Sequence, residues 1–156
     1  MIIGTGIDIV DIARFEQTMT RTPRLSERLF APAERSLRLA SLAARYAAKE
    51  ALIKALGGSD GVHWTEIEIA SEESGRPYFV LTGTTAEVVR ERGISTVHLT
   101  LSHDAGLAAA FVVAEGTDTP SGRPHPPGEA PAGGGPGGQR GSRADTVDDP
   151  PREGRP

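Results

Sequence analysis

The alternation of apolar and polar residues along the chain predicts five strands. The first is rich in Ile and Val and is broken by Gly4 and Gly6, which suits a buried strand that another backbone approaches closely. Ile67 and Ile69 alternate with glutamates, and a turn at 73–76 leads into a returning strand. The last segment is a nearly continuous apolar run. The predicted strands are residues 1–10, 67–69, 77–81, 97–101 and 106–114.

Helix signals lie between these strands. Asp11 has a carboxylate suited to capping a helix that follows it. Pro32 suits the first turn of a helix, and the alanine-rich run after it has strong helix propensity. Thr84-Thr85-Ala86-Glu87 has the spacing of a capping box. We expect helices over residues 12–20, 32–56 and 84–92, so the order of elements predicts an α+β fold with a mostly antiparallel sheet.

The composition changes sharply near Gly116. Residues 117–156 contain 9 Pro and 9 Gly, and almost no apolar side chains. Such a segment cannot bury enough surface to offset its ordering entropy. We therefore expect one folded domain over residues 1–116 and a disordered tail over 117–156 without a catalytic role.

Cysteine content and charge narrow the class of protein further. The chain has no cysteine and no apolar run long enough for a spanning helix or a signal peptide, so we expect a cytoplasmic protein without membrane contact. The net charge of -4 is unevenly distributed, because residues 1–54 carry 9 Lys/Arg against 6 Asp/Glu and residues 55–116 carry 3 against 9. The basic half suits an anionic ligand or an acidic protein, and its small excess does not predict nucleic-acid binding.

Asp8 is the first candidate for chemistry. A carboxylate at a strand end, brought against a helix that carries Glu50, would supply two hard oxygen ligands, which suits Mg²⁺ completed by phosphates and water. Arg45, Lys49 and Lys54 on the same helix would then face those phosphates. The alternatives are that Asp8 caps a turn and that the helix charges form a solvated surface with one Glu50–Lys54 ion pair.

The segment Ser102-His103-Asp104 ends a predicted strand. His103 could donate to a phosphate oxygen, although a lone loop histidine is more often an exposed polar residue. A catalytic triad is not indicated, because adjacent strand residues point to opposite sides. The run GTGIDI is no dinucleotide fingerprint, since Ile9 stands where the third glycine is needed. His63 and His98 have no ligand-like spacing and are interpreted as structural.

Four segments, taken in order, resemble the holo-acyl-carrier-protein synthase family of 4′-phosphopantetheinyl transferases. They are GIDIVDIARF at 6–15, RYAAKEALIKAL at 45–56, GRPYF at 75–79 and LSHDAGLAAAFVVAE at 101–115. The resemblance covers about residues 2–115. It implies that a serine of apo acyl carrier protein attacks the pyrophosphate of coenzyme A and yields holo carrier protein and adenosine 3′,5′-bisphosphate.

The resemblance also implies roles for single residues. Asp8 and Glu50 would be the Mg²⁺ ligands, and Lys54 would meet the pyrophosphate. Either Glu50 or a water on the metal would take the serine proton. The residues expected at coenzyme A are Arg45, Lys49, Lys54, Gly75, Pro77, Ser102 and His103, with Arg45 and His103 near its 3′-phosphate and Gly75 and Pro77 in the wall of its cleft.

The family's partners follow from the same resemblance. Arg14 matches the family motif and would meet the acidic carrier protein, and the charge pattern adds Arg21, Arg24 and Arg28, for which ordinary solubilising surface is the alternative. The compact members of the family assemble as homotrimers with active sites between subunits, so we expect a homotrimer.

Two other functions remain open at this stage. One is a non-catalytic coenzyme A or nucleotide-binding module of the same fold, and the other is a Mg²⁺-dependent phosphodiesterase that uses water instead of a serine. Retention of Asp8, Glu50 and Lys54 together favours the transferase.

The chain departs from the family pattern between Glu34 and Arg45, where the connection of 10 residues is shorter than usual.

Overall fold

The computed structural model describes residues 1–117, so the tail predicted for 117–156 lies, apart from its first residue, outside the described residues. Helices alternate with antiparallel strands, which confirms the α+β class. None of the helices in the described part is long and apolar enough to cross a bilayer. The elements in chain order are β1 (Ile2–Asp11), α1 (Ile12–Arg21), α2 (Leu25–Leu29), the 3₁₀ turn η1 (Pro32–Glu34), α3 (Leu39–Ala55), the 3₁₀ turn η2 (Trp64–Glu66), β2 (Ile67–Ser71), β3 (Pro77–Leu81), α4 (Gly83–Glu91), β4 (Ile94–Asp104) and β5 (Leu107–Gly116).

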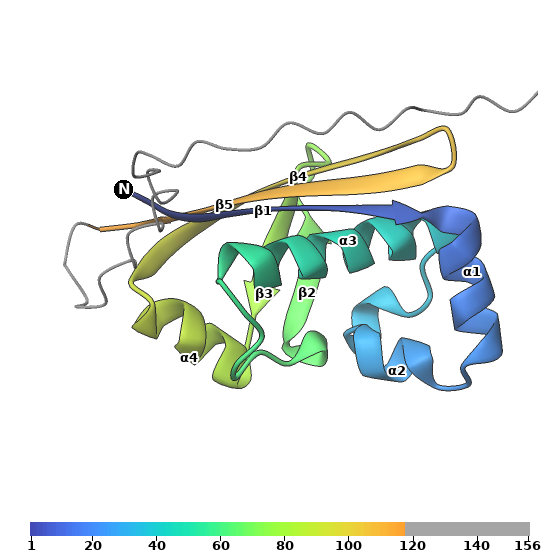
Figure 1. The fold of residues 1–156 in the computed structure, drawn as a ribbon, viewed down its shortest axis with the longest axis horizontal. Helices are drawn as coiled ribbons and strands as arrows, with labels where there is room; N and C mark the ends of the chain where they lie inside the picture. Colours follow the sequence, from blue (N-terminus) through green and yellow to red (C-terminus); the bar gives the residue numbers. More distant parts are fainter. Residues whose placement is uncertain (118–156) are drawn as a thin grey trace, which may run out of the picture. The chain divides into compact units, whose positions relative to one another are not determined.

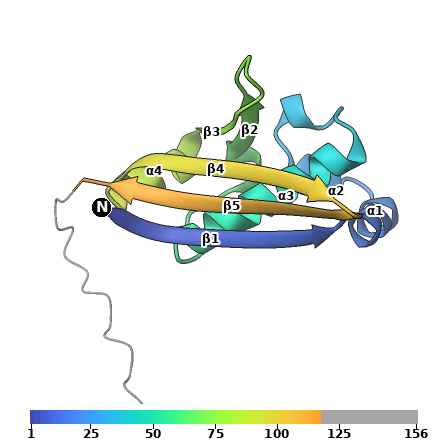
Figure 2. The ribbon, with the colours of Figure 1, turned by 90° about the horizontal axis from the view of Figure 1, so that it is seen from above.

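Three long strands form an antiparallel sheet in the order β1-β5-β4, and α3 lies against one face of it (Figures 1 and 2). The glycines of β1 permit this contact. A Cβ atom on Gly4 would lie 2.0 Å from the carbonyl oxygen of Ala55. A Cβ atom on Gly6 would lie 1.9 Å from that of Ala51. The close backbone approach predicted from these glycines is confirmed, and it brings Asp8, which shares the face of Gly6, against α3.

β2 and β3 form a separate two-stranded antiparallel hairpin (Figure 2). The predicted turn is confirmed: Gly75 has φ +85°, a conformation that glycine adopts without strain. Ile67 and Ile69 of β2 are almost completely buried and belong to the same core as α3. The hairpin therefore adds its apolar face to the single core of the described domain.

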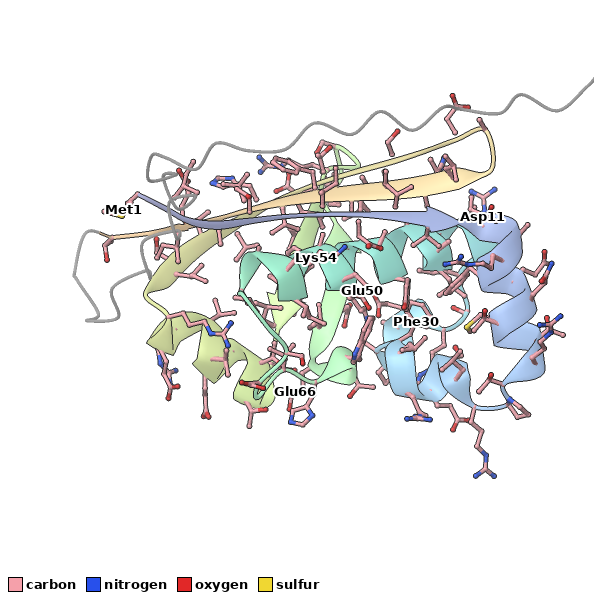
Figure 3. The ribbon with its side chains drawn as sticks, viewed as in Figure 1. Met1, Asp11, Phe30, Glu50, Lys54 and Glu66 are labelled. Atoms are coloured by element: carbon pink, nitrogen blue, oxygen red, sulfur yellow. The ribbon has the colours of Figure 1, made fainter. Side chains whose placement is uncertain are left out.

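The N-terminus of α4 is capped by a side chain from η2. The predicted capping box is wrong, because α4 begins at Gly83 and the cap residue Thr82 makes no side-chain capping bond. Oε2 of Glu66 instead accepts from the backbone amide and the hydroxyl of Thr85, each at 2.8 Å (Glu66 is labelled in Figure 3). These bonds lower the pKa of the Glu66 carboxyl, because they stabilise its charged form.

The long helix starts later than predicted. Pro32 opens only the turn η1, and α3 begins at Leu39. The carboxylate of Glu34 accepts from the backbone amide of Ala31 at 2.9 Å and from that of Ile69 in β2 at 3.0 Å. Because partners from two elements hold this buried side chain, the chain turns here instead of continuing as a helix. The stretch before it, expected as a loop, contains the short helix α2.

Candidate active site

Asp8 is joined to α3 by an ion pair. Nζ of Lys54 donates to Oδ1 of Asp8 at 2.7 Å and to the carbonyl oxygen of Ile7 at 3.0 Å (Lys54 is labelled in Figure 3). The Asp8 side chain is 17% exposed and that of Lys54 is 49% exposed. The fold therefore brings together two residues predicted to act in catalysis, and leaves the Lys54 ammonium open to solvent on one side.

Glu50 lies one turn before Lys54 on α3, and Tyr46 orients it. The Tyr46 hydroxyl lies 3.4 Å from Oε1 of Glu50 and donates to it. The Tyr46 ring stacks on Trp64 at 5.2 Å between centroids and leans on Phe15 at 5.5 Å. Burial raises the pKa of Tyr46, and the charges of Glu50 and Asp8 raise it further. The hydroxyl therefore keeps its proton and donates to Glu50.

A cavity of about 390 Å³ opens beside Asp8 and Glu50. Its lining includes both charged side chains, among them Arg14, and apolar ones. Such a mixed cavity suits a ligand that carries both charge and an uncharged chain. Its lining residues are Asp8, Ile9, Val10, Asp11, Arg14, Phe15, Thr18, Leu25, Leu29, Tyr46 and Glu50.

The donor set at this cavity fits Mg²⁺. Asp8 and Glu50 supply hard carboxylate oxygens, and within residues 1–117 no group of three or more His, Asp or Glu side chains gathers where it could hold a metal. Mg²⁺ commonly takes one or two carboxylates and completes its octahedron with water and substrate phosphates, whereas Ca²⁺ and Zn²⁺ sites need more protein ligands.

A second cavity, of about 370 Å³, lies at the other edge of the sheet. Nη1 of Arg45 donates to the carbonyl oxygen of Ser41 at 3.3 Å, and the Arg45 side chain remains 15% exposed. His103, which β4 carries, lines this cavity together with Arg45. These groups can bind an anion by charge and by hydrogen bonds. The lining residues are Ser41, Ala44, Arg45, Leu101, Ser102 and His103.

The two cavities lie on different sides of α3 and share no lining residue. Arg45 and Glu50 are five residues apart on the helix, and this spacing separates them by about 140° around the helix axis. Asp8 is on the edge strand β1 and His103 is on the opposite edge strand β4, so the strand spacing alone separates them by about 10 Å. The described domain therefore presents two separate cavities, one with Asp8 and Glu50 and one with Arg45 and His103.

Lys49 does not face a ligand, which corrects the expectation from the sequence. Its side chain is 0% exposed, and Nζ donates to Oε2 of Glu34 at 2.7 Å, to the carbonyl oxygen of Leu29 at 2.8 Å and to that of Trp64 at 3.1 Å. These bonds use the three donors of an ammonium. The helix turns Lys49 into the core and its neighbour Glu50 toward the cavity, since adjacent residues point about 100° apart.

Gly75 and Pro77 lie in the β2–β3 hairpin, and neither lines the two cavities described above.

Arg14 lines the same cavity as Asp8 and Glu50, so one chain alone brings it beside these candidate catalytic residues. The other three basic residues of the predicted carrier surface are exposed on or beside the first two helices, Arg21 at the end of α1, Arg24 before α2 and Arg28 within it.

Sequence reasoning missed two residues that support these sites. Tyr46 stands four residues before Glu50, and this i, i+4 spacing was a usable signal for a side-chain contact. Glu34 had no such signal, because its partners come from β2 and α3 and only the folded chain brings them together.

Comparisons with known proteins agree with this geometry. A family model described as the 4′-phosphopantetheinyl transferase superfamily matches residues 4–112. A holo-[acyl-carrier-protein] synthase of Clavibacter michiganensis subsp. michiganensis is 59% identical over 116 residues, which are 74% of this chain and 98% of that protein. The chain belongs to the 4′-phosphopantetheinyl transferase superfamily.

Solved structures support the same assignment. A holo-[acyl-carrier-protein] synthase from Neisseria meningitidis superposes with a TM-score of 0.70 at 33% identity, over 74% of this chain and 99% of that chain. The Helicobacter pylori holo-[acyl-carrier-protein] synthase in complex with coenzyme A superposes with a TM-score of 0.64 at 34% identity, over 71% and 99%.

Proposed function

We propose that the protein transfers the 4′-phosphopantetheine group of coenzyme A to a serine of apo acyl carrier protein. The serine hydroxyl gives its proton to Glu50 or to a water, and its oxygen forms a bond to the phosphorus that bears pantetheine. The bond from that phosphorus to the bridging oxygen breaks, and adenosine 3′,5′-bisphosphate leaves with the electron pair. The observation that carries the proposal is the pair of carboxylates, Asp8 and Glu50, with Lys54 beside them, in a domain of this superfamily. Relatives that match almost over their full length carry the name of this activity.

Asp8 and Glu50 are the residues that would hold Mg²⁺. The ion would neutralise charge on the pyrophosphate, which is the main need of phosphoryl transfer. Lys54, whose side chain is half exposed, would bind the same pyrophosphate beside Asp8. Tyr46 keeps the Glu50 carboxylate turned toward the cavity.

Arg45 and His103 bind the 3′-phosphate of coenzyme A. Ser41 and Ser102 also line this pocket. Gly75 and Pro77 shape the wall of the coenzyme A cleft only when another subunit completes it, because they lie outside both cavities of the single chain.

A homotrimer would unite the two cavities as a metal half-site and an anion half-site of one active site. The sheet face opposite α3 carries apolar residues, because Ile7 pairs with Phe111 in register and Ile9 and Leu107 follow on the same side (Figure 2 looks onto this sheet). They are 57%, 43%, 61% and 44% exposed in the single chain, respectively. Association through this face would bury them and set the Asp8 edge of one subunit near the His103 edge of the next.

The acyl carrier protein would dock beside the metal half-site. Arg14 lines the cavity there, and the exposed Arg21, Arg24 and Arg28 extend the positive surface along α1 and α2. An acidic carrier would be attracted and oriented by these charges. Such a carrier also fits the cytoplasmic location that the sequence predicts and a place in fatty acid biosynthesis.

The release of adenosine 3′,5′-bisphosphate tests the proposal against its alternatives. With coenzyme A and Mg²⁺ present, release is expected with apo acyl carrier protein and not with the same carrier whose acceptor serine is replaced by alanine. Equal release with both carriers would indicate a phosphodiesterase that uses water. Coenzyme A binding without release would indicate a non-catalytic module.

A further inference from the structure

A buried carboxylate links the anion pocket to the core. Glu34 is 2% exposed, and four groups lie close to its carboxylate. They are the amides of Ala31 and Ile69, Nζ of Lys49 at 2.7 Å, and Nε of Arg45 at 3.8 Å. The first three are hydrogen bonds, and they come from the residue before η1, from β2 and from α3. Glu34 is therefore fixed by the fold before any ligand arrives.

Arg45 depends on this carboxylate for its orientation. Its Nε is buried and donates to no hydrogen-bond acceptor, while its Nη1 donates to Ser41. A buried donor without a partner is costly, and the Glu34 charge facing it at 3.8 Å is the compensation that the described residues provide. The guanidinium thus has two of its nitrogens beside Ser41 and Glu34, and Arg45 lines the pocket of His103.

Lys49 balances the charge of this arrangement. Its ammonium lies 2.7 Å from Glu34 and 5.0 Å from the Phe30 ring centroid. Burial lowers the pKa of Lys49, and the Glu34 carboxylate acts against that shift. The Glu34–Lys49 pair is thus neutral as a unit, and the positive charge of Arg45 stays available to an anion.

We propose that Glu34, charge-balanced by Lys49, is a positioning residue that sets the Arg45 guanidinium for the 3′-phosphate of coenzyme A. This inference rests on the proposed function, because it takes the 3′-phosphate as the ligand of the pocket. It gives Lys49, which the sequence placed at coenzyme A, a role through Glu34 instead of a contact with the substrate.

The test compares two ligands that differ only in the 3′-phosphate. The Kd values of both ligands are measured calorimetrically, and the Kd of dephospho-coenzyme A divided by the Kd of coenzyme A reports the 3′-phosphate contact alone. The test protein is the double variant Glu34→Gln, Lys49→Met. It removes one negative and one positive charge, so the net charge is unchanged, and exchange of a whole buried ion pair is tolerated better than loss of one partner.

The expected result is that the ratio falls in the double variant by about two- to tenfold, the cost of ordering one free side chain on binding. Arg45→Ala should lower it at least as far. Ile67→Ala, a buried core variant in β2 that lines neither cavity, should lower stability and keep the wild-type ratio.

Two outcomes would overturn the inference in distinguishable ways. If Arg45→Ala lowers the ratio and the folded double variant keeps it, Glu34 does not position Arg45. If Arg45→Ala leaves the ratio unchanged, the pocket does not bind the 3′-phosphate and the proposed function loses that contact.

A second measurement needs no change at Glu34. The Nε–H signal of Arg45 in NMR spectra of wild-type protein, assigned by its loss in Arg45→Ala, should exchange slowly before ligand is added. Fast exchange would contradict a preset guanidinium.

Discussion

Lys54 and Asp8 are separated by 46 residues in the sequence, and Nζ of the lysine lies 2.7 Å from Oδ1 of the aspartate. The contact depends on backbone packing, because Gly4 and Gly6 let α3 approach β1 so closely that any side chain there would collide with it. Two glycines therefore fix the contact between Asp8 and Lys54, which the sequence could only suggest.

The two carboxylates are expected to be indispensable for transfer. Asp8→Ala or Glu50→Ala should abolish phosphopantetheine transfer because each removes one of the two oxygen ligands available for Mg²⁺. Circular dichroism and thermal melting should show an intact fold, since neither side chain belongs to the buried core.

Asp11→Ala is the matched control for these variants, because Asp11 lines the same cavity but caps α1 by accepting from the amide of Arg14 at 2.9 Å. It should lower the free energy of unfolding by about 1 kcal/mol and retain Mg²⁺-dependent transfer. Near-normal turnover in Asp8→Ala or Glu50→Ala would exclude their role as metal ligands.

Lys49→Met is expected to destabilise the fold strongly. It leaves the carboxylate of Glu34 buried without its ammonium partner, and breaking a buried pair in this way costs about 3–5 kcal/mol. Urea unfolding followed by fluorescence of Trp64 measures the loss. Lys54→Met, on the same helix, breaks only the solvent-facing pair with Asp8 and should cost less than about 1 kcal/mol. Equal losses in the two variants would show that Lys49 is not a core residue.

The signals that the sequence carried correctly were local or periodic. Asp11 caps α1 and the hairpin turns at Gly75, because each of these depends on a residue's own conformation or on neighbours a few positions away. The glycines of β1 indicated a close backbone approach by their missing side chains, although the partner helix α3 is distant in sequence. The strands followed from the pattern of apolar residues, and the mostly antiparallel sheet followed from the order of the elements.

The errors arose where a distant segment supplied the partner. Glu66 caps α4 in place of the box predicted at Thr84, and Glu34 draws Lys49 into the core in place of a ligand. A lysine beside a predicted metal ligand resembles a phosphate contact in sequence, and only the packing of η1, η2 and α3 shows that its ammonium is already satisfied. The arrangement of Arg45 and Glu50 on different sides of α3 also needed the folded chain.

The cap on α4 predicts a pH dependence of stability. The pKa of Glu66 is lower in the folded protein than its usual value of 4.5, so the cap contributes in full above that value and is lost as the pH falls through the folded pKa. The difference in unfolding free energy between wild-type protein and Glu66→Gln should therefore be largest near neutral pH and should shrink below about pH 4.5. A difference that stays constant from pH 7 to pH 3 would contradict an ionised cap.

Active sites shared between subunits predict complementation. Asp8→Ala and Arg45→Ala should each have little activity alone, because one lacks the metal half-site and the other lacks the anion half-site. Random mixed trimers of the two variants, formed by joint refolding and verified by native mass spectrometry, should regain up to about one quarter of the wild-type number of active sites. Each site needs an intact metal half-site from one subunit and an intact anion half-site from its neighbour. Mixed trimers without regained activity would place both half-sites within one subunit.

The most direct test of the central claim is the intact mass of apo acyl carrier protein after incubation with this protein, coenzyme A and Mg²⁺, with a parallel sample that contains EDTA. We expect the carrier to gain the mass of one phosphopantetheine in the first sample and none in the second. An unchanged carrier mass, with several carrier proteins and with demonstrated binding of coenzyme A, would contradict the assignment of Asp8, Glu50 and Lys54 to phosphopantetheine transfer.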